Sequence, residues 1–236
     1  MFSFPKKNFL LATGLVLLLV VPAQSQTITR ELDLRDFDKI EAGNALTIVV
    51  RQGEAFRITA SGEAEGVNDL RGEVKNGELS LYFKEQQNRL RTSKGVRVEI
   101  TLPALKSARF GGTSQSRIER GFTPDNLVVY LTGVAEAEID LDARKLFLDL
   151  SGTSVATLRG QGQSLSANVT GAARLYAQDY PVKDATLDVS GACVAKVNVA
   201  QSLKATAVGT SKVRYRGNPT KNSFDARGIS SIKQGD

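Results

Sequence analysis

Hydrophobic and polar residues alternate through the C-terminal half of the chain, around glycines that recur about every 19 residues. The marker glycines are Gly112, Gly133, Gly152, Gly171, Gly191, Gly209 and Gly228, at spacings of 21, 19, 19, 20, 18 and 19 residues. Alternation with period 2 is typical of β-strands, and a repeat of this length is too short for a pair of helices. The pattern therefore predicts a repeat protein built of strands alone.

Positions at fixed offsets from each marker glycine form columns of similar residues. Two residues before the glycine the side chains are apolar: Phe110, Leu131, Leu150, Val169, Val189, Ala207 and Ala226. Two residues after it they are small: Ser114, Ala135, Ser154, Ala173, Cys193, Ser211 and Ser230. Six residues after it most are apolar: Ile118, Ile139, Leu158, Ala177, Val197 and Tyr215, before Gln234 breaks the column. Five residues after it most are long and polar: Arg117, Glu138, Thr157, Tyr176, Lys196, Arg214 and Lys233. We expect the first three columns to face inward and the fourth to face water.

A chain with stacked columns of this kind is expected to form a β-solenoid, in which each coil pairs in parallel with the next at steps of about 4.8 Å. The glycine would lie at a corner, and the small residue two positions later would leave room where neighbouring legs of the coil converge. Cys193 belongs to the small column, so we expect a buried structural thiol rather than a nucleophile. The hydroxyls one residue before the corner are expected to stabilise turns, at Thr132, Ser151, Thr170 and Ser190.

The N-terminal half of the chain is less regular but also predicts strands. Strand-like runs occupy residues 46–50, 56–60, 79–83 and 96–102, and Asn76 followed by Gly77 is a strong hairpin signal. We expect these strands to begin and cap the solenoid, since an uncapped first coil would expose the core and an unpaired edge. The expected organisation is one all-β domain over residues 26–236, with a strand and capping part at 26–105 and regular repeats at 106–236.

The first 25 residues have the features of a secretory signal peptide. Lys6 and Lys7 form a basic start, residues 9–21 are apolar, and small residues stand at Ala23 and Ser25. The apolar run is 13 residues long, shorter than the roughly 20 residues that a membrane-spanning helix needs. We therefore expect cleavage after Ser25 and an exported mature chain without a transmembrane segment. An uncleaved membrane anchor is the alternative.

Composition excludes several kinds of chemistry. The chain contains no His and one Cys, which removes histidine-dependent acid/base catalysis, His-ligated metal sites and internal disulfides. The formal net charge of +6 falls to +4 without Lys6 and Lys7, a surplus too small to imply nucleic acid. A basic stretch contains Arg89, Arg91 and Lys94, but no aromatic residue is interleaved there, so we expect a solvated loop.

Several segments resemble one family of secreted bacterial proteins. They are FDKI at residues 37–40 followed by NALTI at 44–48, VRVEITLPAL at 96–105, the repeated Ser/Thr-Gly-small units, and VRYRGNP at 213–219. Together they resemble the family described as "putative auto-transporter adhesin, head GIN domain" over nearly the whole mature chain. The resemblance implies a right-handed parallel β-helix in the bacterial envelope or at the cell surface, with no catalytic residues to carry over.

The candidate binding residues form an outward column three residues before the corner glycines. Tyr130, Asp149, Asn168 and Asp188 lie there on four successive coils, where an aromatic ring and hydrogen-bonding groups suit a sugar. A solvated polar face is the alternative. Asp149 and Asp188 have one coil between them and would be about 9.6 Å apart, which is wide for shared metal ligation.

These observations favour a binding protein over an enzyme. A rigid ladder with polar outer columns is sufficient for an adhesin-like surface that binds a glycan or a protein partner in the envelope. No cofactor, metal or nucleic acid is expected. The alternatives are a structural scaffold that serves the envelope under stress and, less favoured, a polysaccharide-active enzyme.

Overall fold

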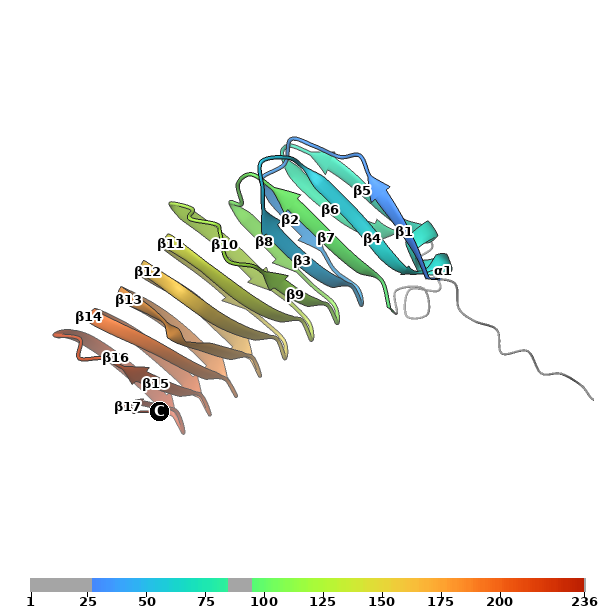
Figure 1. Ribbon diagram of the computed structural model, residues 1–236. Helices are drawn as coiled ribbons and strands as arrows, with labels where there is room; N and C mark the ends of the chain where they lie inside the picture. The colour runs from blue at the N-terminus through green and yellow to red at the C-terminus, as the bar shows by residue number, and fades with distance from the viewer. Residues whose placement is uncertain (1–26, 85–94, 236) are drawn as a thin grey trace, which may run out of the picture.

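The strands of this protein stack into one elongated β-solenoid with two broad faces (Figure 1). The computed structural model describes residues 27–84 and 95–235. Within these residues, 17 strands belong to one hydrogen-bonded sheet, and one short helix, α1 (Ala64–Asp69), interrupts their succession. The predicted all-β solenoid with coils of about 19 residues is confirmed.

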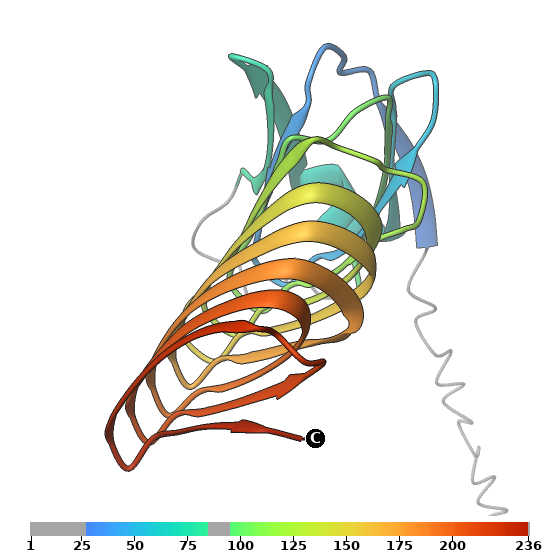
Figure 2. The ribbon, with the colours of Figure 1, turned by 90° about the vertical axis from the view of Figure 1, so that its left-hand side faces the viewer.

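Each regular coil runs along one face, turns, and returns along the other (Figure 2). Four long strands bend around the edge of the solenoid: β11 (Glu136–Leu150), β12 (Val155–Gly171), β13 (Arg174–Gly191) and β14 (Val194–Gly209). In β11, residues 136–143 pair with β12 on what we call the second face, and residues 145–150 pair with it on the first face. Parallel register places equivalent side chains of successive coils in columns along the solenoid axis.

Shorter strands complete the two faces. The first face also contains β2 (Lys39–Ala42), β6 (Glu78–Phe83), β8 (Ser107–Phe110), β10 (Asn126–Leu131) and β16 (Lys221–Gly228). The second face also contains β3 (Thr47–Gln52), β7 (Arg97–Leu102), β9 (Gln115–Ile118), β15 (Lys212–Arg216) and β17 (Ser231–Gln234). The hydrophobic core fills the space between the faces.

The predicted inward columns form this core. Side chains two residues before each marker glycine are buried from Phe110 to Ala207, and those six residues after it are buried from Ile118 to Val197. The small column is buried as well, at no more than 1% exposure for Ser114, Ala135, Ser154, Ala173, Cys193 and Ser211. The column predicted to face water is exposed or half-buried throughout. The predicted phase of the alternation is therefore confirmed.

The marker glycines turn the chain at one edge of the solenoid, as predicted. Gly152 and Gly171 have φ angles of +77° and +85°, in the left-handed region that favours glycine. A Cβ atom on Gly171 would lie 2.7 Å from the carbonyl oxygen of Gly152 in the preceding coil. The backbones of successive corners thus approach too closely for a side chain, which explains why glycine recurs there.

Antiparallel strands cover the N-terminal end of the solenoid. β1 (Thr27–Leu32) pairs with β4 (Arg57–Glu63), β4 pairs with β7, and β5 (Leu70–Lys75) forms a hairpin with β6 across the predicted turn at Asn76 and Gly77. The expected capping strands are therefore present. The stacking order differs from the order along the chain, which the sequence pattern did not predict. The β2–β3 coil lies between the β6–β7 coil and the β8–β9 coil.

The opposite end of the solenoid exposes part of its core. The last coil is made by β16, which pairs with β14, and β17, which pairs with β15. Phe224 occupies an inward position of β16, in register with buried Ala205, yet it is 42% exposed. Its ring lies 5.6 Å from that of Tyr215, measured between centroids. The two ends of the described solenoid therefore differ, with added strands at one end and an exposed coil at the other.

Candidate binding face

The residues expected to bind a ligand lie in one column on the first face. Tyr130 pairs with Asp149, Asp149 with Asn168, and Asn168 with Asp188, across β10, β11, β12 and β13. The column also includes Arg109 before Tyr130, and Thr206 and Asp225 after Asp188. The four predicted residues face outward, because both chain neighbours of each are buried in the core. The structure thus brings all four together in what we call the first-face column.

Tyr130 is the first of the four predicted residues along the column, and two neighbouring side chains contact its ring. The guanidinium carbon of Arg109 lies 4.9 Å from the centroid of the Tyr130 ring, a cation–π contact. The ring of Phe147 meets the Tyr130 ring edge-on, with centroids 6.4 Å apart and an interplanar angle of 62°. Arg109 also lies 3.9 Å from Glu41. The half-buried tyrosine ring is therefore held between neighbours, and Arg109 covers one of its faces.

Polar groups follow Tyr130 along the column. Asp149 and Asn168 are half-buried and Asp188 is exposed. Neither carboxylate makes an ion pair within the described part of the chain. A ligand lying along the axis would meet a carboxylate, an amide and a second carboxylate at steps of about 4.8 Å. The two carboxylates accept hydrogen bonds and the amide both donates and accepts them, as the hydroxyl groups of a sugar require.

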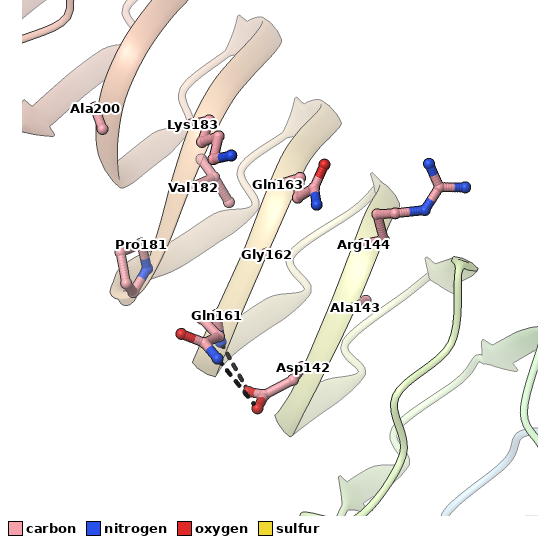
Figure 3. A pocket seen from close by; sticks show the side chains of 10 residues that line it. All are labelled: Asp142, Ala143, Arg144, Gln161, Gly162, Gln163, Pro181, Val182, Lys183 and Ala200. Atoms are coloured by element: carbon pink, nitrogen blue, oxygen red, sulfur yellow. Dashed lines mark hydrogen bonds between the residues drawn. The ribbon is translucent and has the colours of Figure 1, made fainter.

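The edge of the solenoid opposite the marker glycines is called the far corner here. A groove at the far corner was not predicted from the sequence (Figure 3). It has a volume of about 450 Å³ and extends across β11, β12, β13 and β14, from Asp142 to Ala200. The backbone N–H of Gln161 donates to Asp142 Oδ1 at 3.1 Å, and Gln161 Nε2 donates to Oδ2 at 3.5 Å. Arg144, which also lines the groove, pairs with Asp125 at 2.8 Å. Among the polar groups that line this groove, Asp142 and Gln161 thus bond to each other, and Arg144 bonds to a residue outside it.

The far-corner groove lies where two coils differ in length. The marker glycines on either side of Gly191 are 20 residues before it and 18 residues after it, and the strand register shifts around Pro181. The longer coil places Tyr180 in the core, 1% exposed, with its hydroxyl donating to the carbonyl oxygen of Ala143 at 3.2 Å. Burial raises the pKa of Tyr180 to about 12. Unequal glycine spacing is the sequence signal that points to this groove.

Charged side chains on the first coils of the second face form ion pairs. Arg51 lies 2.9 Å from Glu99 and 2.8 Å from Glu119, and Arg97 lies 3.0 Å from Glu99. Hydrogen bonds with Glu119 and Glu99 raise the pKa of Arg51. Hydrogen bonds from Arg97 and Arg51 lower the pKa of Glu99. Because these groups are substantially exposed, each pair contributes at most about 1 kcal/mol to stability.

Cys193 and two of the four corner hydroxyls, those of Ser151 and Thr170, have the expected structural roles. Cys193 is 1% exposed, and its thiol donates to the carbonyl oxygen of Ser190 at 3.3 Å. Burial raises the pKa of the Cys193 thiol, which disfavours the reactive thiolate. Ser151 and Thr170 donate to carbonyl oxygens of the preceding coil at 3.5 and 3.3 Å, so these hydroxyls tie adjacent corners together.

Two expectations concern residues outside the described ranges. They are the signal peptide at residues 1–25 and the basic stretch with Arg89, Arg91 and Lys94. In residues 27–84 and 95–235, no helix has the length and apolar character needed to cross a membrane. The same residues contain no cluster of three or more carboxylate or thiol side chains arranged to hold a metal ion.

Comparison with known families agrees with this architecture. The model of the family described as "Putative auto-transporter adhesin, head GIN domain" matches residues 36–219. The chain belongs to this family. This confirms the family resemblance seen in the sequence, and the protein is called the head GIN protein below. No curated protein matches the chain.

Several solved structures resemble the head GIN protein over most of its length. A "putative adhesin" from Bacteroides fragilis is 25% identical with a TM-score of 0.81, and the match covers 89% of this chain and 97% of that one. A "Putative lipid binding protein" from Parabacteroides distasonis is 20% identical with a TM-score of 0.71, covering 90% and 98%. A "putative adhesin" from Parabacteroides merdae is 15% identical with a TM-score of 0.65, covering 90% and 98%. The last two likenesses show the fold alone.

Proposed function

We propose that this head GIN protein is a non-enzymatic binding protein that holds a glycan along the first-face column. The observation that carries the proposal is the register that aligns Tyr130, Asp149, Asn168 and Asp188 on four adjacent coils. A sugar combines an apolar ring face with hydroxyl groups, and the column combines an aromatic ring with groups that bond hydroxyls. Membership in a family named for adhesion and the likeness to the Bacteroides fragilis adhesin support a surface-binding role.

The surroundings of the first-face column favour an extended ligand. Ser166 and Thr170 flank Asn168 on the same face, and Ser190 stands beside Asp188, so short polar side chains border the column. Backbone pairing fixes the spacing of the coils before any ligand arrives. Because preorganised side chains lose little conformational freedom on binding, an oligosaccharide laid along the axis would meet them at a low entropic cost.

A glycan array probed with the purified protein tests this proposal. For the glycan that binds, Tyr130→Ala combined with Asp188→Ala should weaken the affinity about tenfold or more, because each lost contact is worth about 1 kcal/mol. The melting temperature should change little, since both residues lie outside the core.

The matched control combines Tyr176→Ala with Asp179→Ala, the same residue types on the second-face part of β13. This control should bind the glycan as the wild type does. Unchanged affinity in the first-face variant would exclude the column as the binding site. A folded wild-type protein that binds no glycan on the array would contradict the proposed function itself.

We also propose that the protein is exported to the periplasm or the cell surface, on the basis of the signal-peptide features of residues 1–25. Mass spectrometry of the protein recovered from the bacterial envelope should find an N-terminus at or near Gln26. A protein that still carried Lys6 and Lys7 would show an uncleaved anchor instead.

A further inference from the structure

The outward side chains of the second face change in character along the solenoid axis. On the earlier coils cations face carboxylates: Arg117 pairs with Glu138 at 2.6 Å, and Arg120 lies 3.6 Å from Asp140. On β13, β14, β15 and β17 the same face presents cations, which we call the basic strip: Arg174, Lys196, Lys212, Arg214 and Lys233. The later coils thus lack the charge balance of the earlier ones.

Strand register orders the basic strip into columns. Lys196 pairs with Arg214, and Arg214 pairs with Lys233, so these three cations follow one another at steps of about 4.8 Å. A second outward column lies two residues closer to the marker glycines along each strand. It contains Arg174 of β13 and Lys212 of β15, which are separated by the coil of β14. The cations therefore form a compact array on three to four coils rather than a scatter of surface charge.

The core of this array lacks partners in the part of the chain that the structure describes. Lys196, Lys212, Arg214 and Lys233 make no ion pair with any described residue. The Nη1 atom of Arg214 is shielded from solvent and has no hydrogen-bond partner there. Asp179, the one carboxylate on the second-face parts of these four strands, is in register with Arg159 of β12. Like charges on adjacent strands repel, so the array favours a bound anion.

We propose that the basic strip binds an acidic polysaccharide, a linear polymer whose carboxylate or sulfate groups follow the solenoid axis. The column of cations at a constant step suits an anion that repeats along a chain. Exposed large hydrophobic side chains, which would anchor the face in lipid, are absent from the second-face parts of β13, β14, β15 and β17. Surface attachment to a membrane draws on apolar burial as well as charge, so the strip fits a polymer better than a bilayer. This site lies on the opposite face from the first-face column and is independent of it.

Binding of dextran sulfate and polygalacturonate to the full protein, with neutral dextran as reference, tests the assignment. The wild type should bind both anionic polymers at physiological ionic strength, should lose affinity as salt is added, and should not bind dextran. Lys196→Gln combined with Arg214→Gln and Lys233→Gln should weaken binding at least about tenfold, which corresponds to about 1.4 kcal/mol.

The matched control removes three positive charges from the first face instead, with Lys145→Gln, Lys204→Gln and Lys221→Gln. This control should bind the anionic polymers nearly as tightly as the wild type. Equal weakening of both triple variants would show attraction to net charge alone and would overturn the proposal. So would a folded wild type that binds neither polymer, or one that binds only vesicles containing anionic phospholipid. Loss of polymer binding in the Tyr130→Ala, Asp188→Ala variant would assign the polymer to the first-face column and would also overturn it.

Discussion

Substitution of Leu187 by Asp, compared with the same change at Thr186, tests the alternation on which both faces depend. Leu187 is 0% exposed in β13, between Ala167 and Ala205 of the neighbouring coils. Thr186 is exposed on the first face, in register with Lys204. The two positions are adjacent in sequence, share a strand and lie on opposite sides of the sheet. A much larger loss of stability at position 187 than at position 186 therefore identifies 187 as the position that faces the core.

The expected loss at position 187 has two parts. Removal of the buried leucine forfeits about 2–3 kcal/mol of apolar burial. The carboxyl group that replaces it would lie among alanine side chains, and an unpartnered polar group of this kind costs about 1–3 kcal/mol more even when protonated. The sum, about 3–6 kcal/mol, is a large part of the 5–15 kcal/mol that stabilises a typical domain. Thr186→Asp should stay within about 0.5 kcal/mol, because the new carboxylate lies in water beside Lys204.

Urea unfolding followed by circular dichroism measures the free energy of unfolding of both variants. The pH dependence of this free energy gives a second test of burial at position 187. Burial raises the pKa of a carboxyl at position 187 above its unfolded value, so the unfolded state ionises first as the pH rises. The destabilisation should therefore be smallest below about pH 4 and grow above it. Should Leu187→Asp fail to fold, Leu187→Ala against Thr186→Ala gives the same comparison, with a loss of about 2–5 kcal/mol at Leu187 only. Equal losses at the two positions, or the larger loss at Thr186, would refute the reasoning.

Three further substitutions test the corners and the buried polar groups. Gly171→Ala should lower the melting temperature, at a cost of about 1–2 kcal/mol or more, because alanine would have to adopt a positive φ there and its Cβ would lie 2.7 Å from a backbone oxygen. Calorimetry measures the melting temperature, and an unchanged value would contradict this prediction. Cys193→Ser should change the unfolding free energy by less than about 1 kcal/mol, since Ser211 occupies the same column; a thiol reagent should leave native wild type unlabelled, and rapid labelling would contradict the buried thiol. Tyr180→Phe should remove the tyrosine that ionises with a pKa of about 12 from the ultraviolet titration of the five tyrosines. In the wild type, the unfolded state loses the phenol proton before the folded state does, so stability should fall between about pH 10 and 12. The Tyr180→Phe variant has no such proton, so this fall in stability should be absent.

The regular coils could be predicted from the sequence because their alternation is fixed against a glycine. A slip of one residue would turn Leu158 outward and Thr157 inward, so the pattern determines the face of every side chain in the coil. The alignment of the first-face column followed from the same spacing, since each member lies three residues before its glycine. The contact of Arg109 with the ring of Tyr130 could not be predicted in this way, because it depends on side-chain conformation.

The N-terminal stacking order and the far-corner groove could not be predicted from the pattern. Alternation shows which residues face the core but not which strands are neighbours, and β2 pairs with both β6 and β8, far from it in the chain. The groove depends on a difference of two residues between the coils on either side of Gly191, and the longer coil puts Tyr180 in the core. Lys196, Arg214 and Lys233 were recognised as outward residues, but their lack of carboxylate partners appears only once the register across the coils is known.

The basic strip is not required by the fold, and this gives it a distinctive expected behaviour. The inward columns hold β13, β14 and β15 together, since Leu175, Ala195 and Val213 are each 0% exposed. Like charges at adjacent outward positions oppose this packing rather than support it. Neutralisation of Lys196 and Arg214 should therefore leave the melting temperature unchanged or raise it, while it weakens the binding of anionic polymer. Parallel losses of stability and of binding would instead show that the strip is part of the framework of the coil and that its effect on binding is indirect.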